Sequence, residues 1–310
     1  MKGLLRFLIN NKVIFAFLVI FSFFALFIPN FYSVNNILSV GKQIAVNGIL
    51  AAGMTMVIIT GGIDLSVGSM LALGGVFCAT LFKAGFDPFL AIIITIGIGA
   101  LTGSANGLVI TKIGIPPFIT TLATLSIVRG AALAIGGGKS VSGLGPVFAF
   151  IGRGELLGFP MPLVIMIVIF LVTGFTLSKT RYGVHLYAIG GGEDTSRVLG
   201  LKVNQIKILV YSINGALAAL AAILQMSRLN SGQPLTGVSA ELDAIAAVVV
   251  GGTSLNGGRG RIIGTVFGVA IIGMLTNGLI LLNLSFYYQL AVKGLVILLA
   301  VGMSTERKKN

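Results

Sequence analysis

The sequence predicts an all-α, polytopic membrane protein of about ten transmembrane helices. The first observation is composition, since 56% of the 310 residues are hydrophobic and only 9% are charged. A soluble domain carries about 25% charged residues. The second observation is that apolar residues form runs suited to cross about 30 Å of hydrocarbon, with short polar connections between most of them. We therefore expect residues 1–310 to form a single transmembrane domain in the lipid bilayer.

The first apolar run, residues 13–28, follows Lys2, Arg6 and Lys12. No small-residue cleavage site comes after it, because the chain continues with Pro29-Asn-Phe-Tyr-Ser. We interpret this run as a retained span and not as a signal peptide. A short interfacial helix is expected just after it, at residues 34–40.

Nine further apolar runs complete the expected spans. They are residues 43–60, 66–82, 89–110, 118–135, 161–177, 208–226, 243–253, 262–282 and 286–303. The eighth span, 243–253, is short for a full crossing, which suggests a broken or re-entrant helix. The longest connections are a glycine-rich loop at 136–160, a polar central loop at 178–207 and a polar segment at 228–242.

Lysine and arginine are distributed unequally between the two sides of this arrangement. Segments on the side of the N-terminus carry 14 of the 21 basic residues, the other side carries 5, and 2 lie within spans. Positively charged loops face the cytoplasm, so both termini are expected there. The same rule accounts for the net charge of +13 without a nucleic-acid partner.

Two pairs of short segments suggest an internal duplication. Asn47-Gly-Ile-Leu-Ala-Ala is similar to Asn214-Gly-Ala-Leu-Ala-Ala, and Asn106-Gly-Leu matches Asn277-Gly-Leu. Because the two halves would cross the membrane in opposite directions, spans 2–5 and 7–10 would be inverted repeats, a common construction in transporters. Short matches among Ala, Gly and Leu also arise by chance, so this alternative stays open.

The central loop is the largest polar interruption in the chain. Residues 193–199 are expected to form a short helix, because Glu193 and Asp194 suit a helix N-terminus and Arg197 suits its C-terminal end. Gly200 follows as a left-handed stop. A capped helix on a basic loop suits docking to another protein, and a simply solvated loop is the alternative.

Catalytic chemistry is not expected. Gly138-Lys139-Ser140 lacks the glycine that a phosphate-binding loop needs five positions earlier, where Leu133 stands. His185 and Cys78 are single residues of their types, which leaves little for a metal site or a nucleophile. We expect no enzyme activity and no cofactor.

Polar residues within or beside spans need a structural or functional reason, because charge in the bilayer is costly. Asp64 and Asp243 are each expected to cap a helix, with direct substrate contact as the alternative. Arg129 is expected to snorkel toward a loop, and Lys293 has no evident partner. The candidate translocation pathway is Asn47, Asp64, Ser66, Asn106, Asn214, Asp243 and Asn277, although bridging between helices is the simpler role for the four asparagines.

Several longer motifs support a resemblance. Ile59-Thr-Gly-Gly-Ile-Asp-Leu-Ser-Val-Gly-Ser69 resembles a signature of the permease subunits of bacterial sugar ABC importers. The resemblance extends from about Pro29 to the C-terminus and includes residues 187–191, 200–207, 228–234, 241–254 and 257–262. It implies a homodimeric pore, a cytoplasmic ABC ATPase that hydrolyses the ATP, and a periplasmic or lipid-anchored sugar-binding protein.

The resemblance also implies roles for residues. The family's ATPase-coupling region corresponds to Gly190, Gly191, Gly192, Glu193, Asp194, Arg197 and Gly200. An Asn is expected before the Glu, where this chain has Gly192. The implied cargo is a monosaccharide, ribose first, with another pentose, a hexose or a furanose signalling molecule as alternatives. A secondary transporter is less favoured, because a relay of intramembrane acids is missing from the spans.

Overall fold

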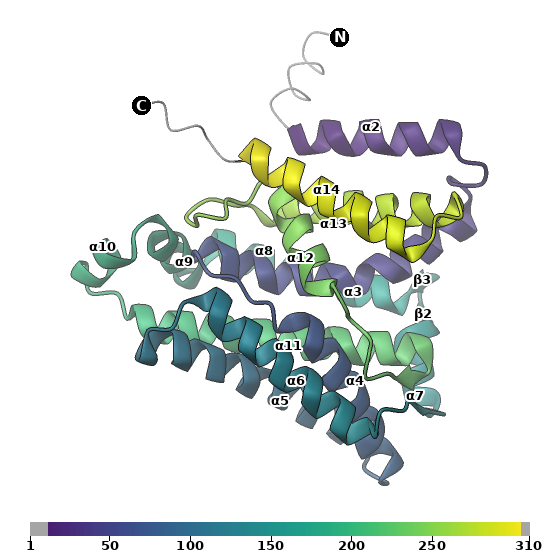
Figure 1. Ribbon diagram of the computed structural model, residues 1–310, viewed down its shortest axis with the longest axis horizontal. Coiled ribbons are helices and arrows are strands. Elements are labelled where there is room, and N and C mark those ends of the chain that lie inside the picture. Colours follow the sequence, from purple (N-terminus) through teal and green to yellow (C-terminus); the bar gives the residue numbers. More distant parts are fainter. Residues whose placement is uncertain (1–11, 305–310) are drawn as a thin grey trace.

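The fold is a bundle of long helices whose axes run mostly along one dimension of the molecule. It is known from a computed structural model that describes residues 12–304. Figure 1 shows α9 and α10 at one end of the bundle and α7 with β2 and β3 at the other. The elements, in chain order, are α2 (Lys12–Phe27), α3 (Val34–Ile59), α4 (Val67–Lys83), α5 (Pro88–Leu108), the π-helical turn η1 (Val109–Ile113), α6 (Pro117–Gly136), β1 (Val141–Ser142), α7 (Pro146–Arg153), β2 (Glu155–Leu156), β3 (Phe159–Pro160), α8 (Met161–Lys179), α9 (Arg181–Gly191), α10 (Glu193–Val198), α11 (Val203–Leu229), β4 (Ser231–Gly232), α12 (Ala240–Val250), α13 (Ile262–Leu281) and α14 (Phe286–Ser304).

Six helices in the described part of the chain are long and apolar enough to cross a membrane. They are α3, α5 together with η1, α6, α8, α11 and α13. Residues Val13–Phe27 of α2 and the whole of α4 are apolar but shorter. The protein is therefore a mostly helical, multi-pass membrane protein.

The structure differs from the predicted elements in three places. The interfacial helix at 34–40 and the second span are one continuous helix, α3, whose first turn is capped by Ser33 accepting from the Asn36 N–H. The glycine-rich loop contains α7, which begins at Pro146, a residue suited to a first helical turn. The central loop contains an additional helix, α9, whose Leu186 and Ile189 are buried.

Two short antiparallel pairings close the end of the bundle opposite α10. Strand β1 pairs with β4, with Val141 opposite Gly232, and β2 pairs with β3, with Leu156 opposite Phe159. The first of these pairings ties the loop after α6 to the loop after α11.

Helix α11 lies at the centre and packs against α3, α4 and α5. The four-residue spacing of Gly99, Gly103 and Gly107 forms the contact face of α5. A side chain at Gly99 would collide with the carbonyl oxygen of Gly215, and one at Gly103 with that of Tyr211. The expected close-packing face is confirmed, because small residues let two helix backbones approach in an environment where lipid competes equally for apolar contacts.

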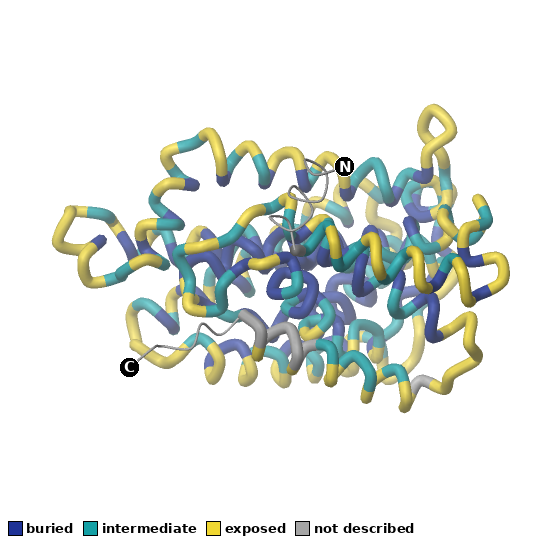
Figure 2. Tube along the Cα trace, turned by 90° about the horizontal axis from the view of Figure 1, so that it is seen from above, coloured by how far each residue is buried: buried dark blue, intermediate teal, exposed yellow. Residues whose placement is uncertain are grey.

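Buried residues gather along the middle of the bundle, and exposed residues lie on its outer faces and ends (Figure 2). The exposed positions include many large apolar side chains on the outward faces of α5, α6 and α8. A soluble protein would not expose so much apolar surface, whereas lipid solvates it.

Candidate functional site

Helices α9 and α10 form an arm, residues 181–198, at one end of the bundle (Figure 1). The arm begins where the Thr180 hydroxyl accepts from the Gly183 N–H at 3.2 Å. The predicted helix at 193–199 is confirmed as α10, and Gly200 follows it with φ +83°. This φ lies in the left-handed region that favours glycine, so the expected stop is also confirmed.

Gly190 lies where the arm meets two other segments. The carbonyl oxygen of Ile59, the last residue of α3, accepts a hydrogen bond from the Gly258 N–H at 2.9 Å. A side chain on Gly190 would collide with both of these backbone groups. The Tyr187 hydroxyl adds a second connection, since it donates to the carbonyl oxygen of Gly260 at 2.9 Å. Movement of the arm would therefore reach the end of α3 and the turn at residues 256–261.

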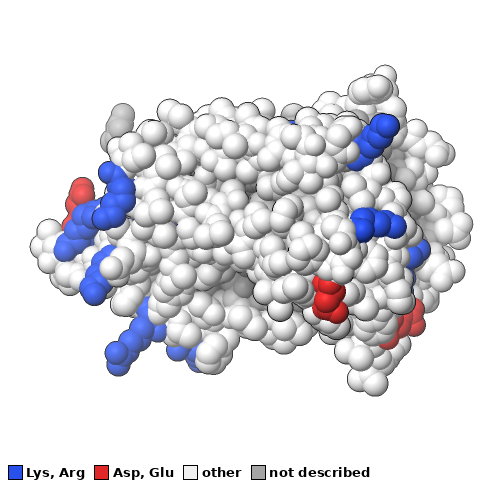
Figure 3. Space-filling model, turned by 90° about the horizontal axis from the view of Figure 1, so that it is seen from below, with Lys and Arg blue, Asp and Glu red and all other residues white. Residues whose placement is uncertain are grey.

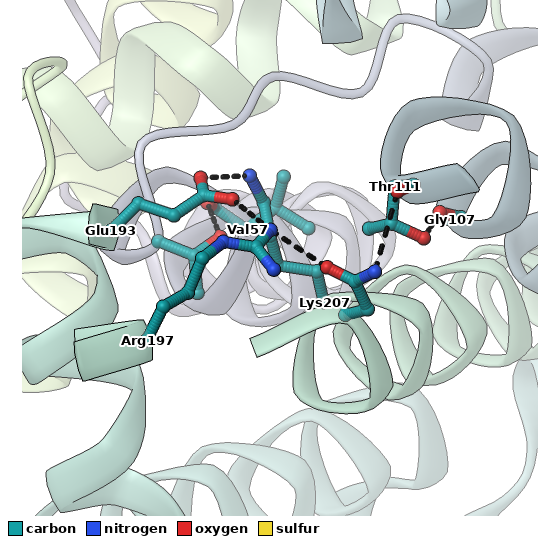
Figure 4. Close-up of polar contacts among 8 residues, drawn as sticks. Val57, Gly107, Thr111, Glu193, Arg197 and Lys207 are labelled. Carbon is teal, nitrogen blue, oxygen red and sulfur yellow. Dashed lines mark hydrogen bonds and ion pairs between the residues drawn. The ribbon is translucent and has the colours of Figure 1, made fainter. Parts of the chain in front are cut away.

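A network of charged side chains holds α10 against α11 (Figure 4). The Glu193 carboxylate accepts from Lys207 Nζ at 2.7 Å and from Arg197 Nη2 at 2.8 Å. The same Arg197 nitrogen donates to Asn204 Oδ1 at 2.7 Å, and Asn204 Nδ2 donates to the Thr111 carbonyl oxygen at 3.4 Å. These contacts join α10, α11 and η1.

The pKa of Glu193 follows from this network. Burial by itself would raise the pKa of the carboxyl group, but the hydrogen bonds and charges of Lys207 and Arg197 outweigh it. The pKa therefore lies below its ordinary value. The carboxylate stays ionised near neutral pH and keeps α10 attached to α11.

The tip of the arm is exposed and apolar. Val198 is 87% exposed and Leu199 is 74% exposed. Asp194 is exposed beside them, whereas Ser196 is buried and faces inward. Two large apolar side chains in water at the end of a helix are a feature that the sequence reasoning missed. The signal was available in the residue order, since Val198 ends the short charged helix α10 and Leu199 follows it directly.

Basic side chains gather at the end of the molecule that carries the arm (Figure 3). Exposed residues of this end include Lys112 after α5, Lys179 and Arg181 between α8 and α9, and Lys202 before α11. The middle of the molecule in the same view is almost free of charge. An apolar tip within a basic surface is suited to bind another protein that carries acidic residues.

A second group of polar residues lies inside the bundle, and we call it the Asp64 network. The Asp64 carboxylate accepts from Asn214 Nδ2 at 2.8 Å, from the Ser66 N–H at 3.0 Å and from Ser66 Oγ at 2.6 Å. Asn106 Nδ2 donates to Ser66 Oγ at 3.0 Å, and Thr124 Oγ1 donates to Asn106 Oδ1 at 2.6 Å. Asp64, Asn106 and Asn214 are each 1% exposed. The network joins α4, α5, α6 and α11.

The segment between α3 and α4 is fixed by this network and by two more hydroxyl groups. Tyr211 donates to the Ile63 carbonyl oxygen at 3.3 Å, and Thr121 contacts the same oxygen at 3.4 Å. The N-cap residue of α4 is Ser66 and not Asp64, and Asp64 holds Ser66 in place instead of accepting from the N–H groups of the helix. The contacts with Tyr211, Thr121 and Thr124 were not predicted, because threonine and tyrosine in apolar helices give no sign of which neighbour they meet.

The cap expected at Asp243 is wrong. Asp243 lies inside the first turn of α12, and its carboxylate accepts from Lys293 Nζ of α14 at 2.8 Å. This ion pair supplies the partner that Lys293 lacked in the sequence. The Arg129 guanidinium reaches a loop, as expected, since it donates to the carbonyl oxygens of Pro234 and Thr236 between β4 and α12, and it also donates to that of Gly68 in α4.

The candidate pathway residues thus fall into four separate groups. Asp64, Ser66, Asn106 and Asn214 bond within one network, and Asp243 pairs with Lys293. Asn277 exchanges two hydrogen bonds of 3.0 Å with Asn36, which joins α13 to α3. Asn47 is half-buried and, within residues 12–304, has no side-chain hydrogen-bond partner. These contacts favour bridging between helices for most of the set, and a pathway role stays a prediction.

Comparison with known proteins gives a family and close relatives. A family profile described as "Branched-chain amino acid transport system / permease component" matches residues 36–301. The ribose import permease protein RbsC of Bacillus subtilis is 50% identical over 284 residues, which cover 91% of this chain and 88% of the relative. RbsC of Haemophilus influenzae is 45% identical, covering 96% and 93%. The L-arabinose transport system permease protein AraH of Escherichia coli is 37% identical, covering 95% and 90%. No solved structure matches the chain.

Proposed function

The chain belongs to the family of the branched-chain amino acid transport system permease component, and from this membership we propose that it is the membrane-spanning permease subunit of an ABC importer for ribose. The observation that carries the proposal is the identity of 44–50% with ribose import permeases over more than nine-tenths of the chain. Relatives named for L-arabinose and D-allose are 37% identical, so another monosaccharide is the second candidate cargo.

We further propose ten membrane crossings in a bacterial inner membrane, with both termini in the cytoplasm. Once the arm helices and α7 are set aside, ten helices remain in the described residues, with η1 counted as part of α5. The bias of basic residues toward the end that carries the arm supports a cytoplasmic position for the arm.

The packing of the helices supports an inverted repeat of spans 2–5 and 7–10. Helix α5 packs on α11, and its counterpart α13 packs on α3. Helix α4 packs on α6, and α12 packs on α14 in the same way. In each repeat, a basic side chain of the fourth helix, α6 or α14, also contacts the start of the second helix, α4 or α12. Arg129 donates to the Gly68 carbonyl oxygen of α4, and Lys293 donates to Asp243 of α12.

In this proposal residues 178–207 are the coupling segment for a cytoplasmic ABC ATPase. The glycines 190, 191, 192 and 200 shape the arm, and Glu193, Asp194 and Arg197 belong to its charged helix. Docking at Val198 and Leu199 would pull on α10, and the contact of Gly190 with Ile59 and Gly258 would carry the movement to α3 and the 256–261 turn. ATP hydrolysis by the partner would then drive alternating access of a pore formed by two copies of the chain, supplied by an external sugar-binding protein.

Transport in a reconstituted system tests this function. We expect vesicles that contain the chain, together with the ATPase and the sugar-binding protein of the same bacterium, to accumulate labelled ribose only when ATP is present. The chain without its ATPase should hydrolyse no ATP. If arabinose or allose were taken up faster than ribose, that sugar would be the cargo instead of ribose. Uptake driven by a proton gradient without the ATPase would contradict the whole proposal.

Cysteine labelling tests the orientation. The native Cys78 is buried and can be replaced by serine to give a clean background. Leu157, 93% exposed between β2 and β3, and Val198 at the arm tip then serve as single cysteine sites. We expect an impermeant maleimide to label Leu157→Cys in intact spheroplasts and Val198→Cys only after the membrane is opened. Labelling of both sites from one side would contradict ten crossings.

A further inference from the structure

A partly open groove of about 790 Å³ lies between α8 and α13. Its walls are apolar for most of their length and include exposed side chains such as Leu171, Phe175 and Ile263. The floor is formed where Gly174 of α8 lets Ile262 approach, since a side chain at this glycine would meet Ile262 Cγ2 at 3.0 Å. The groove contains no residue of the Asp64 network, and Tyr187 is its one lining residue from the arm.

The groove becomes polar at the end nearest the arm. Ser178, Tyr187 and Arg261 line it there. The Ser178 and Tyr187 hydroxyls already donate to carbonyl oxygens, those of Gly174 and Gly260. Arg261 is exposed, and no carboxylate pairs with it within residues 12–304. Burial raises the pKa of the Tyr187 phenol, and the positive charge of Arg261 offsets part of that rise. The polar end therefore offers a guanidinium that pairs with no carboxylate of the described residues.

The length of the groove matches one leaflet of a bilayer. The lining residues of α8 run from Met166 to Ser178. At about 1.5 Å per residue these twelve steps span about 18 Å, against about 15 Å for half of the hydrocarbon core. With the arm at the membrane surface, Arg261 lies at the level of the lipid headgroups and the apolar walls lie beside the acyl chains.

We propose that this groove binds an anionic phospholipid of the leaflet on the arm side, with an acyl chain between α8 and α13 and the headgroup phosphate on Arg261. Charge complementarity selects this occupant. A second copy related by a two-fold axis along the membrane normal would bring the same basic end to Arg261 and repel it. A lipid instead supplies both the apolar chain and the negative charge, and bacterial and organellar proteins bind such headgroups in basic pockets between spans.

Fluorescence quenching tests the proposal, because the chain contains no tryptophan. Phe175→Trp places a single reporter in the groove, and Phe118→Trp places a matched reporter on an exposed position of α6 outside it. The full-length protein is reconstituted in vesicles that contain either brominated phosphatidylglycerol or brominated phosphatidylcholine. We expect phosphatidylglycerol to compete for the groove about fivefold better than phosphatidylcholine, as one cation near an anionic surface predicts.

Two charge variants distinguish a specific lipid-binding site from general electrostatic attraction to the basic end of the protein. In the Phe175→Trp background, Arg261→Gln should reduce the preference to none, whereas Lys112→Gln, which removes an exposed cation of η1 at the same end, should leave it unchanged. The Phe118→Trp reporter should show no preference. Equal competition at Phe175→Trp, or a preference that survives Arg261→Gln, would overturn the proposal. Absence of quenching by either lipid there would show that protein covers the groove instead.

Discussion

Asp64→Ala is expected to lower the free energy of unfolding by about 3 kcal/mol or more, the largest single effect that the structure predicts. The change leaves three buried donors without an acceptor: Asn214 Nδ2, the Ser66 N–H and Ser66 Oγ. An unsatisfied buried donor costs about 1–3 kcal/mol, and Asp64 is only 1% exposed. The thermal stability of the detergent-solubilised chain, followed by size-exclusion chromatography, measures the loss.

A matched variant exists in the same chain. The Asp87 carboxylate likewise accepts hydrogen bonds, from the backbone N–H groups of Phe89 and Leu90, but this residue is exposed. Asp87→Ala should cost only about 1 kcal/mol, the usual value of a helix cap, because water replaces the carboxylate. Asp64→Asn keeps an acceptor oxygen for Ser66 and should recover most of the stability. Equal losses for Asp64→Ala and Asp87→Ala would show that the network contributes little.

The second large effect concerns the arm. Under the proposed function, Val198→Asp with Leu199→Asp should weaken binding of the ABC ATPase about 30-fold or more, since loss of one hot-spot residue of an interface costs about 2 kcal/mol or more. Both side chains are exposed, so the fold of the permease should be unchanged. Copurification of the ATPase and its titration onto the permease in lipid nanodiscs measure the change.

Leu157→Asp is the control for this experiment, because it places the same charge on an exposed leucine at the opposite end of the bundle. Binding of the ATPase should be unaffected by it. Arg197→Glu is a less specific test, since Arg197 also bonds Glu193 and Asn204 and its reversal would weaken the attachment of α10 to α11. Full binding by the double aspartate variant would mean that the arm tip is not the docking surface.

The two helices of the arm differ in how well the sequence predicts them. The short helix and its glycine stop follow from the order of Glu193, Arg197 and Gly200, because caps and charges act within one or two turns. Helix α9 was missed, although it packs Leu186 and Ile189 inward. Its glycines and mixed polarity give it no clear periodicity, and its packing against α3, α8, α11 and the 256–261 turn stabilises it.

The sequence by itself determined the class of protein, the approximate bounds of the long spans and the close-packing face of α5. These are properties of composition, of apolar runs and of spacing along one helix, so neighbouring residues suffice to define them. Only the tertiary structure decided the pairings inside the bundle. Lys293 meets Asp243 across 50 positions, and Asn214 meets Asp64 across 150. Such contacts depend on how each helix is rotated about its axis against its neighbours, and that rotation is set by the packing of all the helices together.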